Sequence, residues 1–223
     1  MSNPPLTVSE LFYSIQGEST RTGLPCAFVR LSGCNLRCRY CDSRYTWEEH
    51  GRKTDLAEIL KWAEAYPEVP VELTGGEPLL QEGTYPLMRE LAARGRTVLL
   101  ETNGSLGIGR VPDAVTVILD LKCPDSGMEN MIDWANIGRL AQRRKRGCRD
   151  EIKFVLSSER DYVWAREVTA EYGLAELATL LLSPADKLMA PSRLAELMLA
   201  DRSPARLQLQ LHRIIWPALE RGV

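Results

Sequence analysis

The sequence predicts an α/β fold, a partial parallel (β/α) barrel with about six strands. Short apolar runs that are typical of strands alternate along the chain with longer segments of helical period, and this order favours a parallel sheet with right-handed crossovers. The chain has 223 residues, fewer than the ~250 that a closed eight-unit barrel usually needs. We therefore expect a single domain over residues 1–223 whose barrel stays open.

The first half of the chain supplies a hairpin and four core strands. Residues 10–25 mix turn-forming residues with a short apolar piece, which predicts a small N-terminal hairpin or lid before the first core strand. Thr54 is a good cap residue ahead of an apolar 3–4 period, so a helix is expected after it. The predicted strands are 26–31, 69–74, 97–101 and 115–119, and the predicted helices are 54–66 and 84–94.

The second half continues the alternation and ends in a different pattern. A basic segment of helical period precedes the next strand, and Arg206-Leu-Gln-Leu-Gln-Leu211 alternates like a strand. We expect residues 206–223 to form a C-terminal strand and tail, with a short helix containing Trp216. The predicted strands are 152–156, 179–182 and 206–211, and the predicted helices are 133–146, 159–172 and 191–200.

Composition excludes several classes of function. Hydrophobic residues make up 44% and charged residues 26% of the chain, as in soluble globular proteins. A net charge of −2 leaves no basic footprint for nucleic acid, and no apolar run reaches the ~20 residues that cross a bilayer. Met1–Pro5 lacks the parts of a signal peptide, and a chain of this length does not need its six cysteines as disulfides. We expect a cytoplasmic protein.

Three cysteines lie directly after the first core strand, at Cys34, Cys38 and Cys41. Cysteine thiolates hold iron–sulfur clusters, and a cubane cluster has four irons. Three local ligands leave one iron free to bind a small chelating molecule. A structural zinc site is the alternative, but such a site is normally closed by four ligands and the chain has only two histidines. A chance grouping of buried thiols is the third interpretation. The spacing favours the cluster.

Polar motifs follow the next three strands. They are Thr74-Gly-Gly-Glu-Pro78, Glu101-Thr-Asn-Gly104 and Asp120-Leu-Lys122. Ligands of parallel α/β folds bind at the carboxyl ends of strands, so these motifs are expected to share one site with the cysteine loop. Taken alone, each is also explained by a turn, a cap, a solvated lysine or an Asp120–Lys122 pair.

Three further features are candidates for binding. Arg30 is a charge inside the first core strand, and a buried charge needs a partner; arginine suits a bidentate contact with a carboxylate. Gln16-Gly17-Glu18 lets the backbone approach a ligand closely, or is a surface turn. Ser43 offers a hydroxyl to a hard cation such as Mg²⁺, or caps a turn.

The cysteine loop, with Tyr40 before the last cysteine, resembles the signature of the radical S-adenosylmethionine (SAM) enzymes. Within that superfamily the chain resembles the 7-carboxy-7-deazaguanine synthases over nearly its whole length. The motifs that carry this resemblance occur in the same order. They are residues 13–18, 28–36, 38–43, 74–78, 101–104 and 208–212.

The resemblance implies a carbon–nitrogen lyase of queuosine and 7-deazapurine biosynthesis. Its reaction is the ring contraction of 6-carboxy-5,6,7,8-tetrahydropterin to 7-carboxy-7-deazaguanine with release of ammonia. A 5′-deoxyadenosyl radical from SAM abstracts hydrogen, so no side chain need act as the abstracting base. The implied cofactors are a [4Fe-4S] cluster, SAM and Mg²⁺. The implied residues are Cys34, Cys38 and Cys41 for the cluster; Ser43 for Mg²⁺; Tyr40, Cys41, Asp42, Gly76, Glu101, Asp120, Leu121 and Lys122 for SAM; and Ile15, Gln16, Gly17, Arg30 and Thr74 for the pterin.

Two segments depart from the family pattern. The motif Asp120-Leu-Lys-Cys-Pro124 stands where better-known members have Ser-Pro-Lys, and residues 216–223 extend past the point where some members end. The resemblance also implies a flavodoxin-like or other reductant and a homodimer. The alternatives are a radical SAM activating enzyme that makes a glycyl radical on a partner protein, and a non-catalytic cluster carrier or zinc module.

Overall fold

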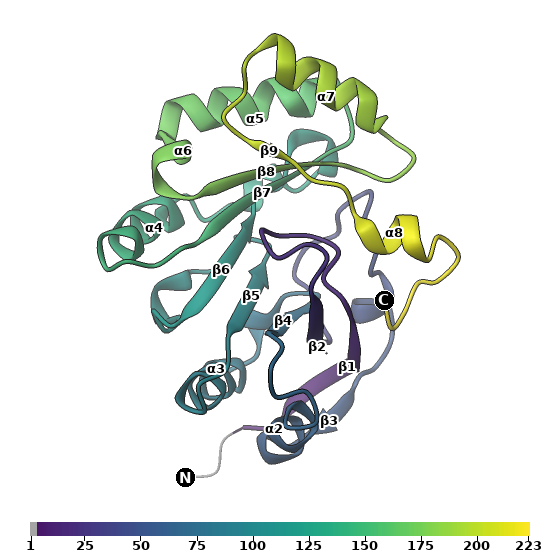
Figure 1. The fold of residues 1–223 in the computed structure, drawn as a ribbon, viewed down its shortest axis with the longest axis vertical. Helices are drawn as coiled ribbons and strands as arrows, with labels where there is room; N and C mark the ends of the chain where they lie inside the picture. The colour runs from purple at the N-terminus through teal and green to yellow at the C-terminus, as the bar shows by residue number, and fades with distance from the viewer. Residues whose placement is uncertain (1–3) are drawn as a thin grey trace.

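The computed structural model describes residues 4–223 and is built on one sheet of nine strands in the order β3-β1-β2-β4-β5-β6-β7-β8-β9. Strands β2 and β4 to β9 run parallel, whereas β1 is antiparallel to both β2 and β3. The sheet curls without closing, so the predicted open parallel barrel is confirmed (Figure 1). The strands are β1 Leu6–Ile15, β2 Pro25–Leu31, β3 Arg52–Thr54, β4 Val71–Gly75, β5 Val98–Thr102, β6 Val115–Asp120, β7 Glu151–Leu156, β8 Thr179–Pro184 and β9 Arg206–Leu207.

Helices α2 to α7 cover the outer face of the curled sheet, whereas α8 lies beside the barrel opening (Figure 1). Between them and the strands lies the main hydrophobic core, to which Leu73 of β4, Leu100 of β5 and Phe154 of β7 belong, each fully buried. Because side chains alternate along a strand, the neighbours of these residues point into the barrel. The helices are α1 Tyr45–Glu48, α2 Leu56–Ala63, α3 Thr84–Ala93, α4 Ala135–Lys145, α5 Glu159–Tyr172, α6 Leu174–Leu177, α7 Pro191–Ala200 and α8 Leu211–Ile215.

The turn between β1 and β2, residues 16–24, enters the open barrel (Figure 1). Its backbone N–H at Thr20 donates to Glu151 of β7 over 3.0 Å. The side chain of Gln208 donates to the carbonyl of Ser19 over 2.8 Å. These bonds hold the tip of the hairpin in the barrel interior. The hairpin is also larger than the 10–25 segment expected from the sequence, because its two strands run from Leu6 to Leu31.

The C-terminal region differs most from the sequence prediction. The strand expected over 206–211 is wrong in extent, because only Arg206 and Leu207 pair with β8. Beyond them the side chain of Gln210 donates to Glu18 and the backbone N–H of Leu211 donates to the Gly17 carbonyl, so this segment bonds to the hairpin. The final helix ends at Ile215, one residue before Trp216.

The helix expected over 54–66 is shorter, because residues 52–54 pair with β1 as β3. None of the helices in the described part of the chain is both long and apolar enough to cross a membrane. Residues 1–3, which belong to the segment where a signal peptide was not expected, lie outside the described residues.

Candidate active site

A cavity of about 460 Å³ opens at the carboxyl ends of the parallel strands, within the size range of small-molecule sites. Every site residue expected from the sequence lines it except Leu121, whose side chain is buried in the hydrophobic core. The backbone N–H of Leu121 donates to the Lys153 carbonyl over 2.9 Å. The predicted residues that line it are Ile15, Gln16, Gly17, Arg30, Cys34, Cys38, Tyr40, Cys41, Asp42, Ser43, Thr74, Gly76, Glu101, Asp120 and Lys122.

The three cysteines of the loop are free thiols that face this one cavity. Burial raises the pKa of Cys38 to about 11 and also raises the pKa of Cys34. Bound iron opposes this effect, because a coordinating thiol is deprotonated outright. Within residues 4–223, no three His, Cys, Asp or Glu side chains converge on a point that one metal ion could occupy. Three thiols around a shared space fit the wider body of a [4Fe-4S] cluster.

The Gly75-Gly76 pair lets β4 approach the cysteine loop. The N–H of Gly76 donates to Leu31 over 3.1 Å, and the N–H of Glu77 donates to Gly33 over 2.8 Å. A Cβ atom on Gly76 would overlap the Gly33 carbonyl oxygen and lie 2.9 Å from the Cβ of Cys34. Only glycine fits at position 76 without moving the loop that carries the three cysteines.

Glu77, which sequence reasoning did not select, joins the ends of β4 and β5. Its fully buried carboxylate accepts hydrogen bonds from Leu79 N–H at 3.0 Å, Thr102 Oγ1 at 2.8 Å and Asn103 N–H at 2.7 Å. Burial raises the pKa of Glu77 to about 7 even though these hydrogen bonds oppose the shift. The Asn103 side chain in turn lies 3.7 Å from Cys34 Sγ. Glu77 thus supports the cluster loop from beneath.

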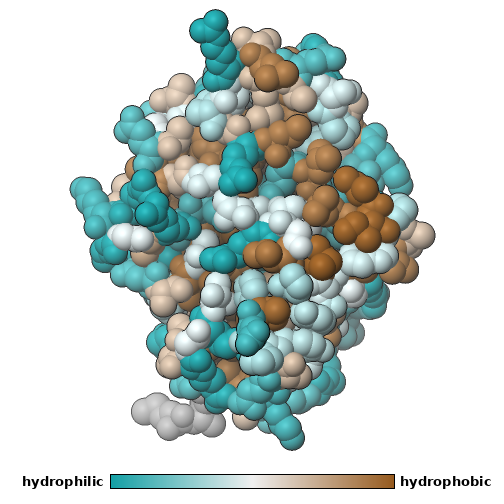
Figure 2. Space-filling model, viewed as in Figure 1, coloured by the Kyte–Doolittle hydropathy of each residue, from teal (hydrophilic) through white to brown (hydrophobic). Residues whose placement is uncertain are grey.

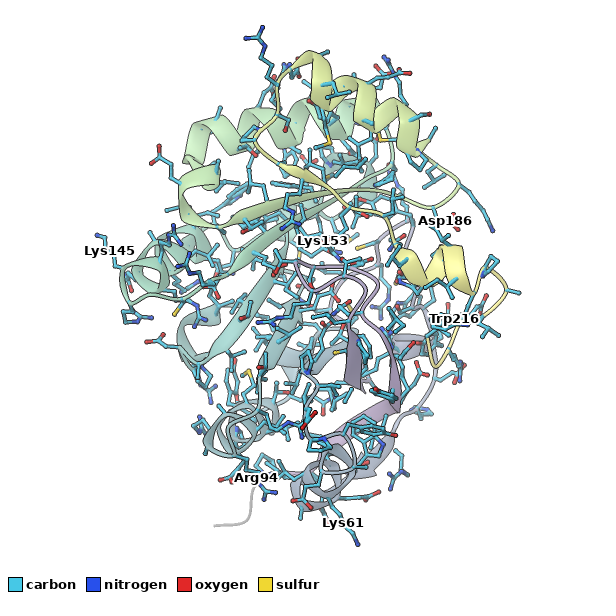
Figure 3. All side chains as sticks on the ribbon, viewed as in Figure 1. Lys61, Arg94, Lys145, Lys153, Asp186 and Trp216 are labelled. Atoms are coloured by element: carbon cyan, nitrogen blue, oxygen red, sulfur yellow. The ribbon has the colours of Figure 1, made fainter. Side chains whose placement is uncertain are left out.

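Lys153 of β7, also absent from the sequence prediction, lies at the centre of the barrel (Figure 3). It pairs with both Glu18 and Glu101. Burial opposes its charge, but these carboxylates raise its pKa well above the usual value. Burial likewise opposes ionisation of Glu101, yet Lys153 and its hydrogen bond bring the pKa of Glu101 below the ordinary range. The barrel interior therefore holds compensated charges.

Asp120 and Lys122 pair through Oδ2 and Nζ at 2.7 Å, which was one of the alternatives that the sequence left open. The other carboxylate oxygen of Asp120 is buried and has no hydrogen-bond partner among the described residues. Since Asp120 lines the cavity, a bound ligand can supply the missing donor. The ammonium and ribose hydroxyl groups of SAM are donors of this kind.

Arg30 lies on the other side of the cavity. Its Nε is 3.2 Å from Glu10 Oε1, and its guanidinium lies 5.3 Å from the centre of the Phe12 ring. Among the described residues its two terminal nitrogens make no hydrogen bond, so they are available to a carboxylate ligand. Glu10 also accepts hydrogen bonds from Tyr45 and, over 3.0 Å, from the N–H of Gly222.

Ser43 donates a hydrogen bond to Asp42 Oδ1 over 2.7 Å, and both residues line the cavity. Hydroxyl and carboxylate oxygens together suit Mg²⁺, which keeps several waters of its own. The donor set therefore fits a magnesium ion. It supplies only part of the coordination shell.

The C-terminal segment closes the cavity, and its role was not predicted. The N–H of Leu211 donates to Gly17 over 3.1 Å, and His212 packs so closely on Gly17 that a Cβ there would overlap its ring. Further along, Arg221 pairs with Glu49. Val223 lines the cavity, so the C-terminal tail reaches the site.

Comparisons with known proteins define the class. A family model described as the radical SAM superfamily matches residues 28–126. The structure of QueE from Escherichia coli superimposes with a TM-score of 0.73 at 25% identity, covering 92% of this chain and 94% of that one. Fold and site together are those of a radical SAM enzyme.

Curated relatives narrow the class further. The chain is 46% identical over 219 residues to a 7-carboxy-7-deazaguanine synthase of Chlorobaculum tepidum, covering 98% of both chains. It is 42% identical to one of Koribacter versatilis, covering 98% of this chain and 100% of the relative. The chain belongs to the 7-carboxy-7-deazaguanine synthase family.

Proposed function

We propose that residues 1–223 act as one radical SAM domain that contracts the ring of 6-carboxy-5,6,7,8-tetrahydropterin to 7-carboxy-7-deazaguanine and releases ammonia, as a step towards queuosine. One observation carries this proposal. The three-thiol loop and the Arg30 guanidinium face the same cavity, so a cofactor and a carboxylated substrate can meet there.

Each wall of the cavity has a role in this reaction. Cys34, Cys38 and Cys41 would hold a [4Fe-4S] cluster, which would supply the reductive chemistry that generates a radical from SAM. Gly76 and Glu101 are assigned to SAM, and the buried, unpartnered Oδ1 of Asp120 would accept a hydrogen bond from it. Tyr40, which donates to the carbonyl of Val155 over 2.9 Å, belongs to the same wall, together with Asp42 and Lys122. Leu121 is assigned to SAM only through its backbone, because its side chain lies in the core.

The pterin lies against the hairpin side. Arg30 binds its carboxylate with the two free terminal nitrogens, while Glu10 fixes the guanidinium. Ile15, Gly17 and Thr74 line the same wall. The Gln16 amide is bound at both ends, since its oxygen accepts from Glu18 N–H over 3.0 Å and its nitrogen donates to Glu72. Gln16 therefore forms part of the cavity wall, and its amide group has its hydrogen bonds within the protein.

Mg²⁺ is assigned to Ser43 with Asp42 as a neighbouring oxygen donor. Ser43→Ala removes the hydroxyl, and we expect the activity of this variant to lose its dependence on Mg²⁺. A Mg²⁺ titration of product formation measures this. A variant that responds to Mg²⁺ as the wild type does contradicts the assignment.

The test of the reaction is anaerobic reconstitution of the cluster, followed by incubation with SAM, a reductant and the carboxylated tetrahydropterin. We expect 7-carboxy-7-deazaguanine, ammonia and 5′-deoxyadenosine in the mixture, identified by mass spectrometry. Cleavage of SAM without a deazaguanine product would leave the enzyme class standing and remove the proposed substrate.

The electron donor is proposed to be flavodoxin-like or another small reductant. Arg37 and Arg39 are exposed on the cysteine loop, and neither makes an ion pair with a described residue, which suits an acidic partner. Because a labile cluster needs a reducing compartment, the cytoplasm is the proposed location.

A homodimer is proposed as the assembled form. Figure 2 shows apolar surface gathered where α8 lies, and Ile214, Ile215 and Leu219 are exposed in this region. Contiguous apolar surface of this kind marks interaction sites. Light scattering after gel filtration should give twice the 25.1 kDa chain mass; the monomer mass contradicts the proposal.

The alternative of a glycyl-radical activating enzyme is not favoured. Such an enzyme must admit a polypeptide, whereas residues 208–223 bond across the cavity to Gly17, Glu18 and Glu10. The family relatives also bear the name of a synthase of a small molecule.

A further inference from the structure

Glu72 is a buried acid in the barrel interior that the proposed function leaves unused. It is the second residue of β4 and is only 3% exposed, yet it lines the cavity. In the β2–β4 register it pairs with Phe28, two residues before the pair formed by Arg30 and Thr74. Glu72 therefore belongs to the floor of the cavity, beneath the carboxylate-binding arginine.

The hydrogen bonding of Glu72 is incomplete. The amide of Gln16 donates to Oε2, whereas Oε1 has no hydrogen-bond partner among the described residues. Glu72 also has no cation within ion-pair distance in the described chain. Other interior acids have partners: Glu18 and Glu101 share Lys153, Asp120 pairs with Lys122, and Glu151 accepts from both the N–H and the hydroxyl of Thr20.

A buried carboxyl without a full set of partners is costly. Burial, reinforced by the nearby Glu101 and Glu18, raises the pKa of Glu72 well above its usual value. N–H donors brought by a ligand would stabilise the carboxylate and offset this cost. Since Oε2 is already bonded to Gln16, the carboxyl group is held in one orientation and presents Oε1 to the cavity.

The proposed substrate carries matching donors. The 2-amino-4-oxopyrimidine edge of a pterin has an N3–H and a 2-amino group side by side, at the end of the bicycle remote from its carboxylate. Glu72 and Arg30 lie on adjacent strands and two residues apart in register, so their Cα atoms are about 8 Å apart by strand geometry. A bicyclic ring whose carboxylate is bound by Arg30 can therefore place its N3–H and 2-amino edge against Glu72 at the floor of the cavity.

We propose that Glu72 is a substrate-specificity residue that accepts hydrogen bonds from the N3–H and 2-amino edge of the pterin, with Gln16 holding its carboxyl group in place. This inference rests on the proposed function, because it takes the pterin as the substrate. It adds a determinant for the pyrimidine end of the ligand, where the sequence analysis assigned none.

The experiment is a binding comparison on the anaerobic, cluster-loaded protein with SAM. The probes are 6-carboxypterin and 6-carboxylumazine, fluorescent ligands that differ in having a 2-amino or a 2-oxo group. The wild type should bind 6-carboxypterin at least about tenfold more tightly, because hydrogen bonds to a charged group carry that much selectivity. Glu72→Gln should bind 6-carboxypterin about tenfold more weakly and lose most of the preference.

Glu151→Gln is the matched control. Glu151 is an equally buried acid of the barrel interior, 2% exposed, but it does not line the cavity. This variant should keep the preference of the wild type. Thermal unfolding of both variants separates loss of binding from loss of fold, and the wild-type comparison of the two ligands requires no variant at all.

Two results overturn the inference: equal binding of both ligands by the wild type, or an undiminished preference in Glu72→Gln. If the wild type forms 7-carboxy-7-deazaguanine but binds both probes alike, only the inference fails. If it neither binds 6-carboxypterin nor forms the product, the proposed function fails, and the inference falls with it.

Discussion

The two sides of the cavity are constructed differently. On the cluster side, residues 33–43 and 75–77, the parts meet through backbone hydrogen bonds and a glycine that excludes any side chain. On the closing side, residues 16–24 and 208–223, the segments are held largely by side chains, including Gln208, Gln210 and Arg221. The cluster side has one permitted geometry, whereas the closing side rests on several bonds of modest strength.

This difference in construction suits the two sides to different tasks. Backbone contacts fix ligands of a cluster within a narrow geometry, as a metal site requires. Side-chain contacts between distant segments can be broken individually, so the closing side is suited to admitting and releasing a substrate. Changes on the cluster side should therefore be severe, and changes on the closing side should be graded.

The largest effect is expected on the cluster side from Cys38→Ala. With two thiols remaining, the cluster should be lost together with all product formation. Cys123→Ala is the control, because Cys123 is a buried free thiol outside the cavity. Iron and sulfide analysis after reconstitution measures the outcome. Full cluster content in Cys38→Ala would contradict the assignment of this thiol as a ligand.

The second effect is a pH dependence from Glu77. Burial raises its pKa in the folded state from 4.5 to about 7. The contribution of this carboxyl to stability is therefore complete below pH 4.5 and is lost as pH rises through 7. Between those limits the free energy of unfolding should fall by about 3 kcal/mol relative to Glu77→Gln. Urea unfolding of the metal-free protein at pH 5 and pH 8 measures this, and parallel curves for both proteins would refute it.

A smaller effect is expected from Glu10→Ala, because Glu10 of β1 holds the tail of the closing side through Gly222. The carboxylate of Glu10 contacts Arg30, Tyr45 and the N–H of Gly222. Its loss should raise the KM for the pterin about tenfold by freeing the guanidinium and the tail, with little change in the KM for SAM. The exposed Glu48 provides the control, as Glu48→Ala. An equal rise in both KM values would mean that Glu10 supports the fold generally.

The smallest effect is expected from Arg221→Ala. Arg221 pairs with Glu49 at the surface and stacks 4.4 Å over the Tyr45 ring. Exposed pairs contribute little, so the KM for the pterin should rise about threefold or less, and more at low salt than at high salt. The control is Arg52→Ala, which breaks an exposed pair with Glu58 away from the cavity. A tenfold or larger effect would show that the tail is fixed more firmly than its contacts indicate.

The same contrast explains which parts of the site the sequence could predict. Cys34, Gly76 and Glu101 each lie in a short motif at the end of a strand, and a parallel sheet brings such ends together. Most helix bounds follow from local periodicity. Leu121 departs from this rule, because alternation along the chain turns its side chain into the core.

The contacts that hold the closing side together could not be predicted, because they join residues nearly two hundred positions apart, as between Glu18 and Gln210. Two charged residues of the barrel interior could have been recognised in the sequence. Glu72 and Lys153 each interrupt an apolar strand, as Arg30 does, and a charge in a buried strand needs a partner. The strand expected over 206–211 was wrong because alternation alone does not provide a pairing edge, and the glutamines bond to the hairpin tip.

The central claim is that three thiols leave one iron open for SAM. Electron paramagnetic resonance of the anaerobically reduced protein, recorded before and after SAM is added, tests it most directly. We expect a [4Fe-4S] signal whose g-values shift on addition of SAM. A signal that SAM leaves unchanged, or a cluster bound by a fourth protein ligand, would contradict the account.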